Sequence, residues 1–81
     1  MKLEVLTPKK IEFQGEVLEI ILPTMAGEIS VLPQHAPLVS VLKSGRIKIK
    51  TKKEEIIIQI DGGILQVAEN SATVLLKNFQ I

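Results

Sequence analysis

The stretch Arg46-Ile47-Lys48-Ile49-Lys50 has the most regular alternation in the chain, with two isoleucines set between three cations. Side chains of a β-strand point in turn to opposite faces, so this period of two predicts a strand with one apolar and one basic face. We expect the apolar face to pack against the core of the protein. The basic face is expected to be a solvated outer surface of a sheet rather than a phosphate site.

The same period of two extends outward from this stretch towards both ends of the chain. We predict strands at residues 2–6, 11–14, 16–22, 28–32, 38–42, 46–50, 55–60, 64–68 and 72–76. Residues 43–45 and 61–63 predict tight turns, Gly15 predicts a bulge or bend, and residues 23–27 predict a loop. No segment of the sequence shows a sustained helical period. The sequence therefore predicts an all-β sandwich or barrel with mostly antiparallel neighbours.

Composition sets limits on the size of the protein and on its chemistry. The 81 residues are enough for one small domain, predicted to span residues 1–81, and 46% of them are hydrophobic. The absence of cysteine excludes disulfides and thiolate metal sites. A net charge of +1, two Phe and no Trp or Tyr give poor support for nucleic-acid binding. The apolar runs are far shorter than the ~20 residues of a membrane-spanning helix, so we expect no direct membrane insertion.

The stretch Gly27-Glu28-Ile29-Ser30-Val31-Leu32-Pro33-Gln34-His35-Ala36-Pro37-Leu38 contains the only histidine, framed by two of the four prolines. Proline fixes φ and lacks an N–H group, so neither Pro33 nor Pro37 fits the middle of a helix or of a central strand. We therefore predict a stiff, exposed corner at residues 34–36 that can present His35 to a partner. A metal site is not indicated, because a lone histidine has no second ligand at a suitable spacing.

This order of residues resembles the signature of the epsilon-subunit family of ATP synthases, in its amino-terminal β-sandwich domain. Shorter matches in the expected order support the resemblance, namely Val5-Leu6-Thr7-Pro8, Phe13-x-Gly15-Glu16-Val17, Leu42-Lys43-x-Gly45, Gly62-Gly63-x-Leu65-x-Val67 and Thr73-Val74-Leu75. The resemblance covers nearly the whole chain, from Leu3 to Leu76. Each piece alone is weak, and the specificity comes from their order and spacing.

The resemblance implies a flattened two-sheet β-sandwich of about ten short, mostly antiparallel strands. It implies a non-catalytic subunit of the central stalk, or rotor, of a proton- or sodium-driven ATP synthase, without a cofactor. Such a subunit joins the gamma subunit to the membrane rotor ring of c subunits, and so couples ion flow to ATP synthesis. Its expected place is the cytoplasmic face of a bacterial cell membrane, or the stromal face of a plastid thylakoid, as a peripheral protein. The isolated domain is expected to be a monomer or a weak dimer.

The resemblance also implies which residues make contacts. Gly27 and Glu28 are expected to contact the rotor ring at one end of the sandwich. Contact with the gamma subunit is expected from four neighbouring residues, His35, Ala36, Pro37 and Leu38. The chain departs from the family at Ser30 and Gln34, where glycine is usual, and this affects only the local backbone. Many relatives continue into two carboxy-terminal helices that can inhibit ATP hydrolysis or bind ATP. No part of this sequence matches those helices, so neither property is expected of residues 1–81.

A second hypothesis is a carrier domain of the lipoyl or biotinyl type, which is also small and all-β. Its attachment lysine must stand at the tip of an exposed hairpin, and Lys43 precedes a predicted turn. The neighbours of Lys43 are not the usual Asp or Met, which counts against this hypothesis. A third hypothesis, a small hydrolase, has no supporting set of residues, because no serine or carboxylate spacing indicates a triad with His35. For His35 itself, packing against Pro33 or Pro37 is the plain structural alternative.

Overall fold

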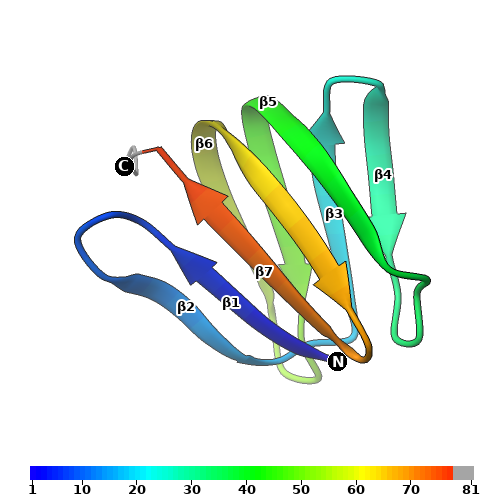
Figure 1. Ribbon diagram of the computed structural model, residues 1–81. Coiled ribbons are helices and arrows are strands. Elements are labelled where there is room, and N and C mark those ends of the chain that lie inside the picture. Colours follow the sequence, from blue (N-terminus) through cyan, green and yellow to red (C-terminus); the bar gives the residue numbers. More distant parts are fainter. Residues whose placement is uncertain (78–81) are drawn as a thin grey trace.

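The computed structural model describes residues 1–77 and shows an all-β fold (Figure 1). Within these residues there is no helix, in agreement with the prediction. The strands, in chain order, are β1 (Lys2–Leu6), β2 (Ile11–Glu16), β3 (Glu19–Thr24), β4 (Gly27–Val31), β5 (Leu38–Lys50), β6 (Glu55–Ala68) and β7 (Ser71–Leu76). Along these segments buried and more exposed side chains alternate, as expected of strands with one face on the core. In β7, for example, Ala72, Val74 and Leu76 are buried and the residues between them are not.

The seven described strands form one hydrogen-bonded sheet in the order β2-β1-β7-β6-β5-β3-β4. Strands β1 and β7 pair in parallel, and every other neighbouring pair described is antiparallel. Figure 1 shows this sheet folded over into two layers, and the molecule measures 27 × 27 × 19 Å. The prediction of a flattened and mostly antiparallel sandwich is confirmed.

Two long strands carry the chain from one layer into the other. Strands β5 and β6 pair on both sides of the bend, from Leu38 opposite Val67 to Lys50 opposite Glu55. Both strands curl over in the middle, where the two layers meet (Figure 1). The prediction of tight turns at residues 43–45 and 61–63 is wrong, because both segments lie inside these strands. Predicted strands merge in pairs, so residues 1–77 contain seven strands rather than the larger number that the resemblance implies.

Glycines explain why the chain can bend here without leaving the sheet. Gly62 has a φ of +99°, which residues other than glycine rarely adopt. A Cβ atom on Gly63 would lie only 2.4 Å from the Leu75 carbonyl oxygen, so β6 passes β7 too closely for a side chain. In β5, a Cβ atom on Gly45 would lie 3.1 Å from the side chain of Pro23. The glycines that suggest turns in the sequence therefore serve as bends within strands.

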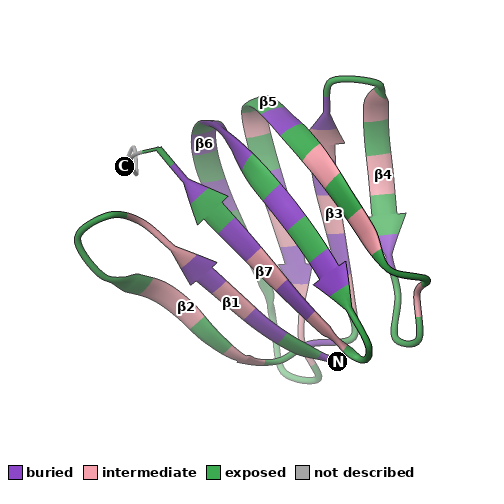
Figure 2. Ribbon diagram, in the orientation of Figure 1, coloured by how far each residue is buried: buried purple, intermediate pink, exposed green. Residues whose placement is uncertain are grey.

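The core lies between the two layers and is built from aliphatic side chains, which appear as alternating buried segments along the strands (Figure 2). Its members on the two long strands are Leu42, Ile47, Ile49, Ile58, Ile60, Leu65 and Val67. In both strands the side chains that face the core stand at even-numbered positions before the bend and at odd-numbered positions after it. Leu3 of β1, Ile20 of β3 and Val74 of β7 are fully buried beside them. Burial of each such side chain contributes about 1.5–3 kcal/mol.

Among the strands that do not merge, β2 and β3 differ most from their predicted bounds. Strand β2 runs straight through Gly15, and the chain leaves the sheet only at Val17. Val17 is buried and its N–H donates to the Met1 carbonyl oxygen at 2.8 Å, so contacts distant in sequence set this boundary. Pro23, predicted to lie in a loop, is inside β3. The pairing of β3 with β5 is irregular next to Pro23, as expected for a residue without an N–H group.

Candidate interaction surfaces

Gly27 and Glu28 follow the tight turn between β3 and β4. The buried Thr24 shapes this turn, because its hydroxyl donates to the Gly27 carbonyl oxygen at 2.5 Å and accepts from a backbone N–H of the turn at 3.2 Å. Gly27 has a φ of +124°, a conformation that favours glycine. The Met25 N–H donates to the Val41 carbonyl oxygen at 3.0 Å, which ties the turn to β5. Glu28 is exposed at this well-supported end of the molecule.

The corner predicted at residues 34–36 is present as a loop between β4 and β5. Gln34 has a φ of +68°, a left-handed conformation that residues other than glycine rarely adopt. The His35 N–H donates to the Leu32 carbonyl oxygen at 3.1 Å, and His35 Nδ1 lies 2.7 Å from the Ala36 carbonyl oxygen. A carbonyl oxygen can only accept, so Nδ1 carries the hydrogen. In the described part of the chain the ring makes no hydrogen bond to a serine or a carboxylate, which gives no support to a catalytic triad.

The structure does not bring the two predicted contact sites together. Gly27 and Glu28 begin β4, whereas the loop at residues 32–37 follows the end of the same strand (Figure 1). At ~3.3 Å per residue, this five-residue strand separates the sites by roughly 15 Å. Leu38 differs from its neighbours in the loop, because it begins β5 and is partly buried against the core.

The outer surface of one layer carries an apolar row. Val41 lies opposite Ile64, and Ile64 lies opposite Leu75, so these side chains form one row across β5, β6 and β7. They are 56%, 44% and 43% exposed, and Val39 on the same side of β5 is 69% exposed. We call Val39, Val41, Ile64 and Leu75 the apolar face. None of these residues is among the sites predicted from the sequence. The signal that could have found them is the occurrence of adjacent apolar residues, such as Val41-Leu42, which put apolar side chains on both faces of a strand.

The outer surface of the other layer carries the row of cations on β5. The three cations of residues 46–50 alternate with two buried isoleucines, as the sequence predicts. Lys50 Nζ lies 3.4 Å from Glu19 Oε1, and the Ser30 hydroxyl donates to the other oxygen of the same carboxylate. The hydrogen bond from Ser30, together with Lys50, lowers the pKa of Glu19 despite a smaller opposing effect of desolvation. This surface is a hydrogen-bonded and solvated face, in line with the prediction.

Replacing Ser30 with alanine is expected to raise the pKa of Glu19 towards its ordinary value, because the carboxylate loses a hydrogen bond that stabilises its charged form. A lowered carboxyl pKa stabilises the fold at pH values above the unfolded-state pKa, and this contribution disappears as the pH falls through the folded-state pKa. The variant should therefore lose less stability than the parent protein on acidification. A titration of the Glu19 carboxyl carbon by NMR measures the shift, with Ser40→Ala as the control. An unchanged Glu19 pKa in Ser30→Ala would contradict the expectation.

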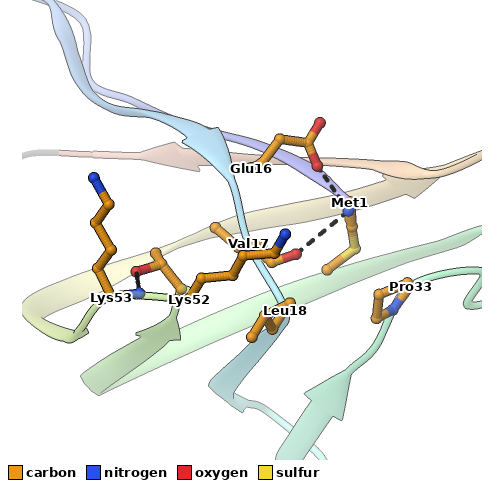
Figure 3. Close-up of a pocket in the computed structure, with 8 residues that line it drawn as sticks. Met1, Glu16, Val17, Leu18, Pro33, Lys52 and Lys53 are labelled. Carbon is orange, nitrogen blue, oxygen red and sulfur yellow. Dashed lines mark hydrogen bonds and ion pairs between the residues drawn. The ribbon is translucent and has the colours of Figure 1, made fainter.

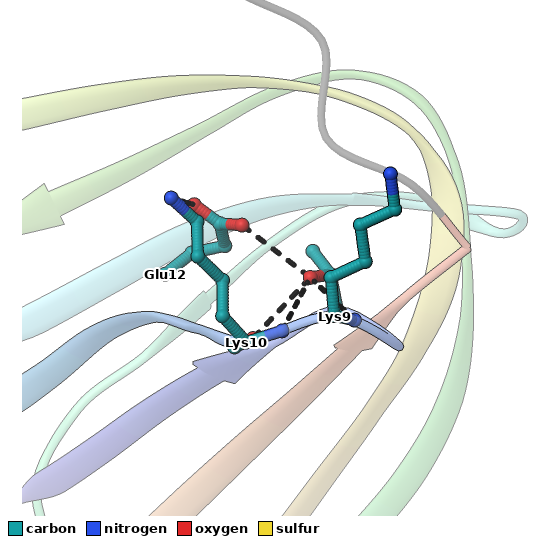
Figure 4. Close-up of polar contacts among 4 residues, drawn as sticks. Lys9, Lys10 and Glu12 are labelled. Atoms are coloured by element: carbon teal, nitrogen blue, oxygen red, sulfur yellow. Dashed lines mark hydrogen bonds and ion pairs between the residues drawn. The ribbon is translucent and has the colours of Figure 1, made fainter.

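Two hairpin turns of the same construction carry lysine pairs. In the first, the Thr7 hydroxyl accepts from the N–H groups of Lys9 and Lys10, both at 3.3 Å (Figure 4). In the second, the Thr51 hydroxyl accepts from the Lys53 N–H at 3.2 Å and from the Glu54 N–H at 3.1 Å. The first turn follows the end of β1, and the second lies near Met1, at the start of β1. The two lysine pairs therefore lie at opposite ends of the molecule.

Other chemistry considered from the sequence finds little support. Lys43 lies at the bend inside β5 and not at a hairpin tip, so the carrier-domain hypothesis loses the hairpin lysine on which it depends. Residues 1–77 contain no group of three or more His, Asp or Glu side chains that could hold a metal ion. In the same part of the chain, no helix is long and apolar enough to cross a membrane.

Comparison with known proteins decides the family. Residues 1–80 match the family model described as "ATP synthase, Delta/Epsilon chain, beta-sandwich domain". The chain belongs to this family. The ATP synthase epsilon chain of Chlorobium limicola is 38% identical over 78 residues, which cover 95% of this chain and 89% of that relative. The resemblance seen in the sequence is thereby confirmed.

Other relatives of this delta/epsilon sandwich are longer. The ATP synthase epsilon chain of Nitratiruptor sp. is 45% identical over 80 residues, covering 95% of this chain and 60% of the relative. The chloroplastic epsilon chain of Piper cenocladum is 37% identical over 78 residues, covering 96% of this chain and 59% of the relative. The chain thus spans about three fifths of the length of these two relatives.

Solved structures share the fold of the delta/epsilon sandwich. A chain from the central stalk and c-ring structure of the Tetrahymena thermophila mitochondrial ATP synthase has a TM-score of 0.84 at 17% identity, covering 98% of this chain and 64% of that one. A chain of the Euglena gracilis mitochondrial ATP synthase has a TM-score of 0.88 at 22% identity, covering 94% of this chain and 49% of that one. At these identities the likeness shows the fold alone.

Proposed function

We propose that this delta/epsilon sandwich is part of the central stalk of a rotary ATP synthase, where it joins the gamma subunit to the membrane rotor ring of c subunits. The family match over residues 1–80 is the observation that carries the proposal. The domain performs no reaction itself and passes torque from the ion-driven ring towards the catalytic head. It acts as a peripheral protein, on the cytoplasmic face in a bacterium. A close-packed sandwich suits this task because it deforms little under load.

The end of the molecule that carries Gly27 and Glu28 is the proposed contact with the ring. Two features support this assignment. The carboxylate of Glu28 is exposed, and the turn before it is held both by the buried Thr24 and by a backbone hydrogen bond to β5. Polar contacts at the rim of an interface fix register and orientation more than they add affinity. Glu28 would therefore keep the ring and the sandwich in one relative orientation during rotation.

Replacing Glu28 with arginine is expected to loosen the ring contact without unfolding the domain, since the side chain is exposed and surface substitutions usually change stability by less than ~0.5 kcal/mol. Reversal of the charge should weaken binding to the ring roughly tenfold. Proton pumping by the complex reconstituted in vesicles measures coupling. Glu54→Arg, at an exposed residue of the turn between β5 and β6, away from both proposed contacts, is the matched control. Unchanged pumping by Glu28→Arg would count against the assignment.

The proposed contact with the gamma subunit combines the residues predicted from the sequence with the apolar face. Val39 directly follows Leu38 in β5, so the contact predicted at residues 35–38 continues onto the apolar face. Interfaces commonly have an apolar centre surrounded by polar residues. The apolar face would supply the centre, and the loop with His35 would supply part of the rim. The isolated domain is then a monomer, or a weak dimer that pairs through this uncovered surface.

A binding experiment with purified subunits tests the whole proposal. The immobilised domain should retain the purified gamma subunit, and the two together should retain the detergent-solubilised ring of c subunits. A folded domain that retained neither partner would show that the proposed function is wrong. Intact mass after expression with lipoyl and biotinyl ligases tests the carrier hypothesis in parallel, and no adduct is expected, because Lys43 lies within a strand.

A further inference from the structure

A cavity lies at the end of the molecule remote from Glu28, and the loop at residues 32–37 borders it through Pro33. Its volume is about 400 Å³, within the ~300–1,000 Å³ typical of small-molecule sites. One side of it is apolar, formed by Met1, Val17, Leu18 and Pro33 (Figure 3). The hairpin turn that carries Lys52 and Lys53 forms the other side.

The charged groups around the cavity differ in whether they have a partner of opposite charge. The Met1 ammonium donates to the Glu16 carboxylate at 3.0 Å and to the Val17 carbonyl oxygen at 3.3 Å, so both members of this ion pair are engaged. Within residues 1–77, neither Lys52 nor Lys53 has a carboxylate within 4.0 Å of its ammonium group. Figure 3 shows the Lys52 side chain reaching across the cavity, whereas that of Lys53 points away. Lys52 is therefore a cation with an open place for an anion beside an apolar wall.

Both walls of the cavity are held in place before any ligand arrives. The side chain of Leu18 is 48% exposed, yet its backbone N–H donates to the Lys50 carbonyl oxygen at 2.7 Å. Across the cavity, the Thr51 N–H donates to the Glu54 carbonyl oxygen at 2.9 Å and closes the lysine turn. A ligand that covered Leu18 would remove apolar surface from water without ordering the backbone first, which favours binding.

We propose that this cavity binds a medium-chain fatty carboxylate. The carboxylate would accept a charge-assisted hydrogen bond from the Lys52 ammonium. The alkyl chain would lie against the exposed side chains of Leu18 and Pro33. The limited volume favours a single short chain over a two-chain membrane lipid. This inference does not depend on the proposed central-stalk function, and the two share only the loop at residues 32–37, which borders the cavity through Pro33.

A titration with decanoate, followed by the backbone amide signals in NMR, tests the proposal below the concentration at which decanoate forms micelles. Saturable shifts are expected at Val17, Leu18 and the lysine turn. Decanol, which has the same chain without the charge, should bind roughly tenfold more weakly. The pair Lys52→Gln and Lys53→Gln should weaken decanoate binding by about the same factor.

Matched variants separate a specific site from general attraction. Lys9→Gln with Lys10→Gln removes the same charge from the equivalent turn at the other end and should leave binding unchanged. Leu18→Gln should weaken binding, whereas Met25→Gln, at a side chain that is 69% exposed elsewhere, should not.

Three results would overturn the proposal. The first is NMR shifts confined to the apolar face, and the second is equal affinity for decanoate and decanol. The third is an equal loss of decanoate affinity when either lysine pair, Lys52 with Lys53 or Lys9 with Lys10, is replaced with glutamine. A fourth result would overturn it in favour of a membrane surface, namely binding to phosphatidylglycerol vesicles that depends on Lys52 and Lys53 when decanoate does not bind.

Discussion

Replacing Gly63 with alanine is expected to destabilise the protein by about 3 kcal/mol, since the added carbon overpacks a site with no room. Its Cβ atom would lie 2.4 Å from the Leu75 carbonyl oxygen and 3.2 Å from Leu76 Cδ2. The oxygen belongs to the backbone of β7, which pairs with β6 at this point, so it cannot move without disturbing the ladder. For 81 residues the total free energy of unfolding is roughly 4–12 kcal/mol, so the loss is a large fraction. Urea denaturation measures it.

The matched control for this variant is Gly15→Ala. A Cβ atom there would lie 3.6 Å from the ring of Phe13, which is an ordinary contact. Both substitutions reduce the conformational freedom of the unfolded chain in the same way, so their difference isolates the clash. Gly15→Ala should stay within ~0.5 kcal/mol of the parent protein. If the two variants were equally stable, the close approach of β6 and β7 would not exist in solution.

Replacing Ile64 with glutamate is expected to weaken binding to the gamma subunit by about 2 kcal/mol, roughly thirtyfold. Ile64 is the middle member of the row on the apolar face, between Val41 and Leu75. A carboxylate placed there would have to lose its hydration in the interface without a partner of opposite charge. Calorimetric titration of the domain with purified gamma subunit measures the affinity.

Ile57→Glu is the matched control for Ile64→Glu. It changes the same residue type on the same strand, and its side chain is 53% exposed against 44% for Ile64. Ile57 lies opposite Lys48, on the basic surface of the other layer. Its replacement should leave gamma binding unchanged, and both variants should unfold at similar temperatures. Equal weakening by the two variants would show that gamma does not bind the apolar face.

The candidate contacts differ in how far they can be predicted from the sequence. The corner at residues 34–36 is predictable because proline restricts the chain locally, whatever surrounds it. The apolar face is not. Val41 and Leu42 are both apolar, and so are Ile64 and Leu65, so alternation does not tell which of each pair faces the core. In the structure Leu42 and Leu65 are buried and their neighbours are exposed, and this choice depends on how the long strands bend.

Residue alternation by itself determined that residues 1–77 form strands and no helix, and proline by itself determined the place of the corner beside His35. Only the tertiary structure decided that residues 43–45 and 61–63 bend within strands instead of ending them. The physical reason is that glycine permits both a tight turn and a bend. A bend forms, rather than a turn, when the residues after the glycine stay paired with the same neighbouring strand as the residues before it. Both halves of β5 stay paired with β6, and Gly63 stays paired with β7, through contacts between residues distant in the sequence.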